Sequence, residues 1–262
     1  MKAILSVFRD RFAHRRALTC IYTIAYAVCL SASIYFFAAK NARGALVALL
    51  FSLIILSLPI AEALARIEIP AACYALLLFL CVGALFGSTF NFYFLIPFWD
   101  TLLHALSGWL FSAIGYTICT QLFPKQEESG VFSYLFFGVI FSLALAVLWE
   151  LFEAGATWLL PLDMQEDTLV HSFRSFYLSG THDAPIELQG ITETVIHFGD
   201  EVLVVPGYLD LGLADTLSDM AVCLGGSLLF LAIFPLDRLF GGRLAPLLLP
   251  RSANKKKGSK PL

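Results

Sequence analysis

Charged side chains are scarce in this sequence. They make up 14% of the 262 residues, whereas hydrophobic residues make up 59% and the mean hydropathy is +0.80. Soluble domains carry about a quarter charged residues and fewer apolar ones. Here the apolar residues gather in runs long enough to cross a hydrocarbon layer about 30 Å thick. The composition therefore excludes an ordinary soluble domain and indicates an integral membrane protein.

Cysteine patterns that bind metals or form disulfide frameworks are also missing. No two cysteines have the CxxC spacing, and all six fall within the apolar runs. A thiol in such a run usually packs as a small hydrophobic group, which we favour over a redox or metal-binding role. The residues are Cys20, Cys29, Cys73, Cys81, Cys119 and Cys223.

The apolar runs predict an all-α polytopic membrane protein, a six-helix transmembrane bundle. Transmembrane helices 1–5 lie within residues 17–160 and the sixth within 213–236, separated by an extracytoplasmic loop or lid at 161–212. Residues 1–16 and 237–262 form basic terminal segments. The first apolar run exceeds that of a typical cleavable signal peptide, so we expect an uncleaved helix. The predicted spans are 17–38, 44–65, 70–90, 98–122, 130–160 and 213–236.

The distribution of lysine and arginine predicts the orientation. With the N-terminus inside, 14 of the 17 basic residues lie on the cytoplasmic side, and only Lys40, Arg43 and Arg174 lie outside. Cytoplasmic loops carry an excess of basic residues, so both termini should be cytoplasmic. We expect a multi-pass protein of the bacterial cytoplasmic (inner) membrane, with membrane lipids as partners and no nucleic-acid partner. The sequence leaves the oligomeric state open.

The long segment 161–212 predicts one β-hairpin. Residues 192–198 and 201–205 are rich in β-prone side chains, and they flank Gly199-Asp200, a pair typical of tight hairpin turns. Residues 168–178 mix apolar and polar types without a clean period. They could lie at the membrane surface or cap the bundle.

Six ionisable residues lie within apolar helices that contain no lysine or arginine. They form three pairs spaced by three or four residues, so both members of each pair share one helix face. Ionisable groups at membrane depth are costly and usually mark ion paths, proton relays or catalytic sites. The pairs are Asp100 with His104, Glu150 with Glu153, and Asp215 with Asp219.

The predicted topology places all three pairs in the extracytoplasmic half of the membrane. At 1.5 Å per residue, the pairs of 98–122 and 213–236 lie about 3 and 9 Å below the outer ends of those helices. The glutamates lie about 10 and 15 Å deep. Carboxylates with one imidazole suit a divalent metal ion such as Mg²⁺, Mn²⁺, Fe²⁺ or Zn²⁺. The predicted ligands are Asp100, His104, Glu150, Asp215 and Asp219, and the predicted catalytic residues are Glu153 and Glu150.

Simpler roles compete with this prediction for some of the residues. Asp100 and Asp215 could each cap a helix, and His104 could be a hydrogen-bonded core histidine. Glu150 and Glu153 lie in mid-helix and cannot cap anything. Two glutamates one turn apart repel unless one is protonated or a cation lies between them.

Two further features bear on packing. Glu62 precedes Arg66 by four residues, so an intrahelical ion pair is its simplest explanation. Small residues allow helices to approach closely in membranes. We expect this role for Gly108, Gly115, Gly225 and Gly226.

Four motif-bearing stretches stand out between about residues 55 and 230. They are Pro97-Phe98-Trp99-Asp100 with His104 and Gly108; Leu148–Glu153; Leu162–Gln165 with Asp167-Thr168; and Gly207–Asp210 followed by Gly212–Asp219. Together they resemble the DUF2238 family of bacterial membrane proteins, which includes the YjdF-type inner-membrane proteins. The resemblance implies a membrane protein with a shared polar constellation, and it implies no particular reaction.

The resemblance also adds residues of the 161–212 loop to the candidate site. Its motifs include Asp163, Gln165, Asp167 and Asp210 as possible rim members. Solvated turn residues are the alternative interpretation, because these amino acids are frequent in turns.

Three functions fit the predicted site. The first is a metal-dependent membrane hydrolase or transferase acting on a lipid or lipid-linked headgroup, with Glu153 as general base. The second is a cation or proton-coupled transporter. The acids lie toward one face, however, and no inverted repeat is visible. The third is a non-catalytic, metal-stabilised scaffold or sensor.

Overall fold

The computed structural model describes residues 16–64, 67–123, 130–159 and 163–252. The chain forms two compact units. Unit 1 comprises Met1–Ala146 with Met220–Leu262, and unit 2 comprises Val147–Asp219. The division falls within two continuous helices, α7 (Gly130–Leu159) and α9 (Leu213–Leu231).

The described residues contain six helices long and apolar enough to cross a membrane, which confirms the predicted fold class. Five follow the predicted spans to within two residues at each described end. The sixth ends at Leu231, five residues early, and α10 follows after a turn at Ala232. Pro235 explains this break, because it has no N–H to donate to the carbonyl of Leu231. The six are α2 (Arg16–Ala38), α3 (Ala42–Leu64), α4 (Ala71–Thr89), α6 (Trp99–Leu122), α7 and α9.

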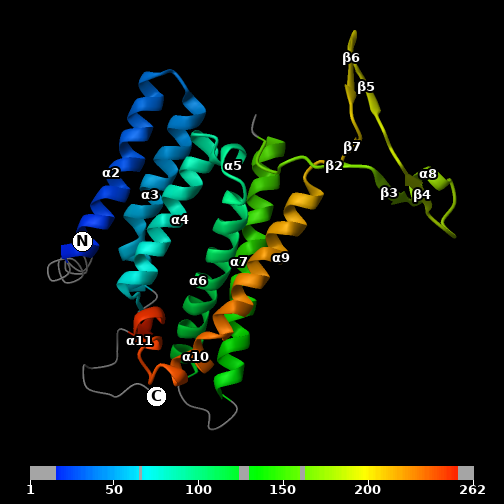
Figure 1. The fold of residues 1–262 in the computed structure, drawn as a ribbon. Coiled ribbons are helices and arrows are strands. Elements are labelled where there is room, and N and C mark those ends of the chain that lie inside the picture. Colours follow the sequence, from blue (N-terminus) through cyan, green and yellow to red (C-terminus); the bar gives the residue numbers. More distant parts are fainter. Residues whose placement is uncertain (1–15, 65–66, 124–129, 160–162, 253–262) are drawn as a thin grey trace. The chain divides into compact units, whose positions relative to one another are not determined.

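The main core of unit 1 lies among α2, α3 and α4, which run side by side in Figure 1. Tyr74, Ile55 and Leu78 are among its fully buried side chains. Helix α6 joins this group through Leu110, and the indole N–H of Trp99 donates to the carbonyl of Gly83 at 3.1 Å. The short helix α5 (Phe92–Leu95) precedes α6.

The C-terminal residues up to Ser252 fold back onto unit 1. After α10 (Ile233–Leu239) and α11 (Ala245–Leu248), β8 (Arg251–Ser252) pairs antiparallel with β1 (Ile67–Glu68). The segment is held by side chains of two helices: Cys73 of α4 bonds to the carbonyl of Leu248, and Thr117 of α6 to that of Pro250. The lysine-rich end of the predicted tail lies outside the described residues.

Glu62 is buried at the end of α3 and accepts the backbone N–H of Ile69 at 2.6 Å. This bond joins the end of α3 to a residue just before α4. Arg66, its predicted partner, lies outside the described residues.

Close helix contacts in unit 1 occur at three of the four predicted glycines. A Cβ on Gly108 would lie 2.1 Å from the carbonyl oxygen of Cys223, and one on Gly226 would lie 2.0 Å from that of Ala105. Gly115 similarly faces Phe141. The prediction was wrong for Gly225, which has no such neighbour within 4 Å among the described residues, because it lies about 100° around the helix from Gly226.

The described residues of unit 2 form three short antiparallel strand pairs. The predicted hairpin is confirmed by β5 (Thr194–Phe198) and β6 (Glu201–Val205), with Gly199 at φ +56° in the first turn position. The other pairs were not predicted, and they occupy part of the region without a clean period. They join β2 (Leu169–Val170) to β7 (Tyr208–Leu209) and β3 (Ser172–Ser175) to β4 (Ile186–Gln189), with helix α8 (Phe176–Ser179) after β3.

Candidate metal centre

Unit 2 brings three of the predicted site residues together. Glu150 and Glu153 lie on α7, and Asp219 lies on α9. One carboxylate oxygen from each lies within 4.8 Å of the others. All three side chains are buried, with exposed fractions of 5%, 8% and 5%. Two glutamates of α7 and one aspartate of α9 therefore lie close together within this unit.

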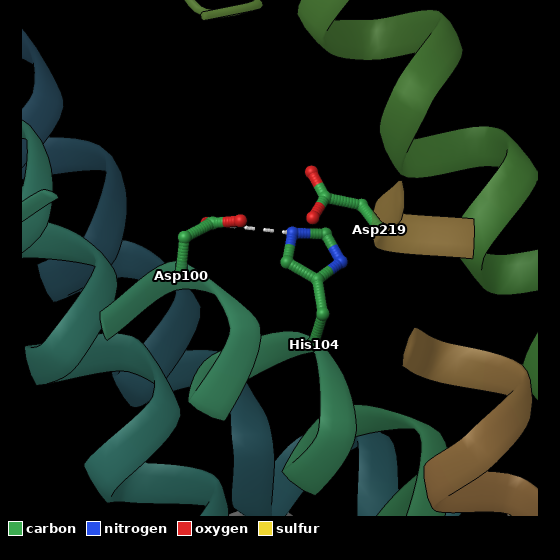
Figure 2. Close-up of side chains that lie close together, drawn as sticks. All are labelled: Asp100, His104 and Asp219. Atoms are coloured by element: carbon green, nitrogen blue, oxygen red, sulfur yellow. Dashed lines mark ion pairs between the residues drawn. The ribbon is translucent and has the colours of Figure 1, made fainter. Parts of the chain in front are cut away.

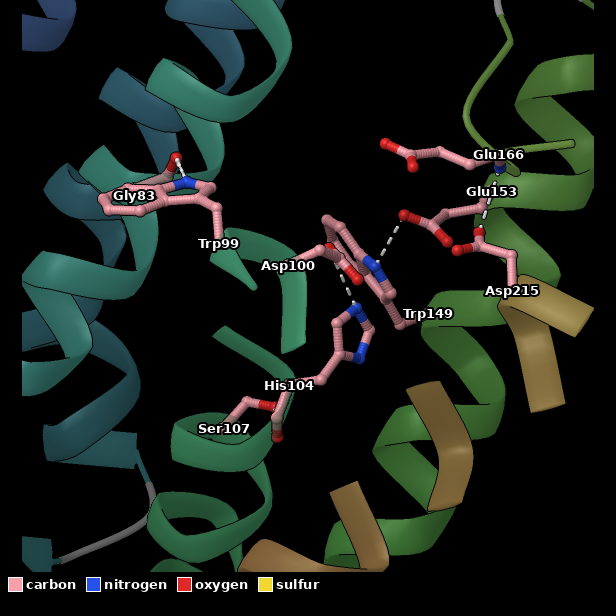
Figure 3. A network of polar contacts seen from close by, with 9 residues as sticks. All are labelled: Gly83, Trp99, Asp100, His104, Ser107, Trp149, Glu153, Glu166 and Asp215. Carbon is pink, nitrogen blue, oxygen red and sulfur yellow. Dashed lines mark hydrogen bonds and ion pairs between the residues drawn. The ribbon is translucent and has the colours of Figure 1, made fainter. Parts of the chain in front are cut away.

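The carboxylate of Glu153 is oriented by its neighbour one turn earlier. The indole N–H of Trp149 donates to Oε1 of Glu153 at 2.9 Å (Figure 3). The rings of Trp149 and Phe152 lie 5.5 Å apart, which helps to fix the indole. Sequence reasoning did not single out Trp149, although its spacing of four residues from Glu153 was a usable signal.

The loop that follows α7 is tied to the ends of both helices. The N–H of Met164 donates to the hydroxyl of Thr157, and the side-chain amide of Gln165 donates to the hydroxyl of Thr216 at 2.7 Å. Gly212, at φ +82°, lies against Gln165, where a Cβ would come within 2.5 Å of that side chain. These contacts fix the described part of the loop, from Asp163 onward, beside the end of α7 and the start of α9.

Asp215 has a different position from the three buried carboxylates. It is half-buried in the first turn of α9, and its Oδ2 accepts the N–H of Glu166 at 3.1 Å (Figure 3). Among the described residues it does not belong to a group of three potential ligands within 4.8 Å. Its visible role is to hold the loop, while its role as a ligand stays a prediction.

Asp210, rather than Asp215, accepts the backbone N–H groups at the start of α9. Its carboxylate accepts the N–H groups of Thr168 at 2.9 Å, Ala214 at 2.7 Å and Gly212 at 3.3 Å. Burial opposes ionisation of this carboxyl, but these hydrogen bonds outweigh it and lower its pKa. The neighbouring Asp167 has a raised pKa, because of partial burial and the nearby charges of Asp163 and Asp210.

We expect Asp210→Asn to destabilise unit 2 by about 1 kcal/mol at neutral pH, because the amide nitrogen that replaces one carboxylate oxygen cannot accept an N–H group. The lowered pKa means that the wild-type contribution is present above the ordinary carboxyl pKa of about 4 and is lost as pH falls through the folded value. Thermal unfolding by tryptophan fluorescence at pH 7 and pH 3 checks this. A deficit that does not shrink at pH 3 would contradict it.

Unit 1 contains the remaining predicted pair. Nε2 of His104 lies 3.6 Å from Oδ1 of Asp100, one turn apart on α6 (Figure 2). His104 is buried and Asp100 is half-buried. The N-cap of α6 is Phe98, at φ +63°, so Asp100 lies within the first turn rather than at the cap. The negative charge of Asp100 is favourable at this helix N-terminus.

Three carboxylates this close require a compensating charge. Two unit charges 4.8 Å apart repel by about 3 kcal/mol at an effective dielectric constant of about 20. Bound protons or a cation would remove this repulsion. Carboxylate oxygens suit hard cations such as Mg²⁺ or Mn²⁺ better than soft ones.

The comparisons with known proteins identify the family. The model of a predicted membrane protein family, DUF2238, matches residues 19–237, and the chain therefore belongs to this family. This match confirms the resemblance drawn from the motifs. No match was found among curated proteins or among solved structures.

Proposed function

We propose that this DUF2238 protein holds a divalent cation with Glu150, Glu153 and Asp219 and uses it in hydrolysis or group transfer on a lipid or lipid-linked headgroup. The observation that carries the proposal is the approach of three buried carboxylates within 4.8 Å, on two helices that are apolar enough to cross a membrane. We further propose that the site faces the extracytoplasmic side of a bacterial inner membrane, as the distribution of basic residues predicts.

The charge of unit 2 supports a cation from solution. Residues 147–219 contain 13 aspartates and glutamates, and Arg174 is the only lysine or arginine in that range. The guanidinium of Arg174 is bound to both carboxylate oxygens of Glu187 at 3.2 Å. An acidic region of this kind attracts cations and raises their local concentration.

Each residue of the centre has a distinct role in this proposal. Glu150 and Asp219 would coordinate the ion directly, and the negative charge of Glu153 beside them would help to retain it. Glu153, with one oxygen fixed by Trp149, would use the other to accept a proton from the attacking group as general base. A bound divalent ion supplies a more acidic coordinated water and stabilises negative charge in the transition state.

The sequence alone supports a role in the metal centre for the other predicted ligands. Asp100, His104 and Asp215 remain predicted ligands because of their expected depth. Gln165 and Asp210 already have structural bonds within unit 2, so we assign them to shaping the loop beside the site.

Elemental analysis of the purified protein tests the metal centre. After dialysis against Mn²⁺ or Mg²⁺, we expect about one ion per chain in the wild type, and at least tenfold weaker binding in Glu150→Gln with Glu153→Gln, because two of the three charges are removed. Glu193→Gln is the matched control, since it removes an exposed carboxylate of the same unit. Equal binding by the double variant would refute the centre.

A turnover assay then separates an enzyme from a scaffold. Lipids with labelled headgroups are incubated with the metal-loaded protein and with Glu153→Gln. We expect headgroup release or transfer by the wild type and at least a hundredfold slower reaction by the variant, which lacks the base. Stoichiometric metal without turnover would favour the scaffold, and cation uptake into vesicles would favour the transporter.

A further inference from the structure

The hairpin formed by β5 and β6 exposes apolar side chains on both faces. Strand residues alternate between faces, so Val195, Val202 and Val204 lie on one face and Ile196, Phe198 and Leu203 on the other. These six side chains are between 37% and 57% exposed. Figure 1 shows the hairpin as an extended two-stranded ribbon.

Such a ribbon is poorly suited to stand alone in water. An isolated two-stranded hairpin is marginally stable, and contiguous exposed apolar patches mark interaction sites. Among the described residues, the sheet has only these two strands, so each has an open edge. Open edges with apolar side chains pair readily with an added strand.

The turn shows which backbone groups are available. In a hairpin with a two-residue turn, the residues beside the turn bond to each other and the pairs then alternate. Phe198 and Glu201 flank the turn. The residues with outward N–H and C=O groups are therefore Val195 and His197 on β5, and Val202 and Val204 on β6.

Charge selects the class of partner. No lysine or arginine occurs between Arg174 and Arg238, whereas Glu193 precedes β5, Asp200 lies in the turn and Glu201 begins β6. Two copies of the acidic unit 2 would repel each other, and an anionic lipid surface would repel the unit for the same reason. Insertion into hydrocarbon is excluded by the unpaired edges. A segment that carries lysine or arginine beside apolar residues complements both the negative charge around the ribbon and the apolar side chains on its two faces.

We propose that the β5–β6 ribbon is a docking surface for an extended, basic, apolar segment of another protein, which adds as a strand to one of its edges. Backbone hydrogen bonds then supply affinity, and the acidic flanks supply selectivity. This surface is independent of the carboxylate centre.

A synthetic peptide of alternating valine and threonine with lysine at both ends tests the proposal, with a glutamate-ended peptide for comparison. Binding to the full-length protein in neutral detergent is measured by fluorescence anisotropy. We expect the lysine peptide to bind at least tenfold more tightly at low salt, and the difference to shrink at high salt. Equal binding of the two peptides, or no binding, overturns the proposal.

Proline variants of each strand test which edge of the ribbon binds the peptide. Val204→Pro removes an outward N–H from β6 without breaking the ribbon, and Val195→Pro does the same for β5. One of these should weaken binding of the lysine peptide at least tenfold, while Val204→Thr and Val195→Thr, which keep the N–H, should not. Thermal unfolding confirms that each variant folds. Undiminished binding by both proline variants, or a concentration-dependent dimer cross-linked through the ribbon, contradicts the proposed partner.

Discussion

Gly226→Ala is expected to destabilise the protein by about 3 kcal/mol or more, whereas Gly225→Ala is expected to be neutral or stabilising. The added Cβ at Gly226 would lie 2.0 Å from the backbone oxygen of Ala105, so two helices would have to separate. Overpacking a tight contact typically costs about 1–3 kcal/mol, and backbone neighbours cannot rotate away. Within the described part of the chain, a Cβ at Gly225 meets nothing within 4 Å, and alanine removes the helix penalty of glycine, which is about 1 kcal/mol.

The destabilisation should spread to the hydrogen bonds at the same crossing. The backbone carbonyl of Gly108 on α6 accepts hydrogen bonds from the hydroxyl of Ser142 on α7 at 3.0 Å and from that of Ser227 on α9 at 3.2 Å. Three helices therefore meet at this carbonyl. Separation of α6 from α9 would break the bond from Ser227 to Gly108, a net loss of about 1 kcal/mol, because the Ser227 hydroxyl still has the carbonyl of Cys223 at 2.9 Å as an acceptor. Thermal unfolding in detergent, followed by size-exclusion chromatography, measures the effect. Equal midpoints for the two alanine variants would contradict the close contact.

This crossing also shows where sequence reasoning reaches its limit. The apolar runs predicted the spans, because bilayer thickness fixes the length of a transmembrane helix. They could not decide which of two adjacent glycines faces a neighbour, since that depends on the rotation of α9. Rotation is set by tertiary contacts such as that between Gly226 and Ala105, which no local pattern encodes.

The same distinction holds in unit 2. The hairpin of β5 and β6 was predictable because its strands flank a two-residue turn with Gly199 in it. The pairing of β3 with β4 was not, because both strands have four residues and the intervening stretch contains the short helix α8. Likewise, ExxE spacing predicted that Glu150 and Glu153 share a face. The depth estimate could not tell that Asp219, rather than Asp215, completes the trio.

Asp219→Asn is expected to abolish stabilisation by divalent metal while raising the stability of the metal-free protein. With metal at 100 times its Kd, the wild type should gain about 2.7 kcal/mol. The variant loses a charged ligand from a trio within 4.8 Å, so this gain should fall to nearly zero. In the presence of a chelator, the variant should be more stable than the wild type, because removal of one carboxylate relieves repulsion of about 3 kcal/mol per charged pair.

Asp215→Asn distinguishes two hypotheses. In one, only the three buried carboxylates bind the ion, and in the other Asp215 is a ligand as well, as the sequence predicts. If the ion is held by Glu150, Glu153 and Asp219, this variant keeps the metal-dependent rise in unfolding temperature and loses only the bond to the N–H of Glu166. If it loses the rise as Asp219→Asn does, Asp215 is also a ligand. A rise that survives in both variants places the ion elsewhere. Because the two aspartates lie one turn apart on the same helix, altered helix propensity cannot account for a difference between them.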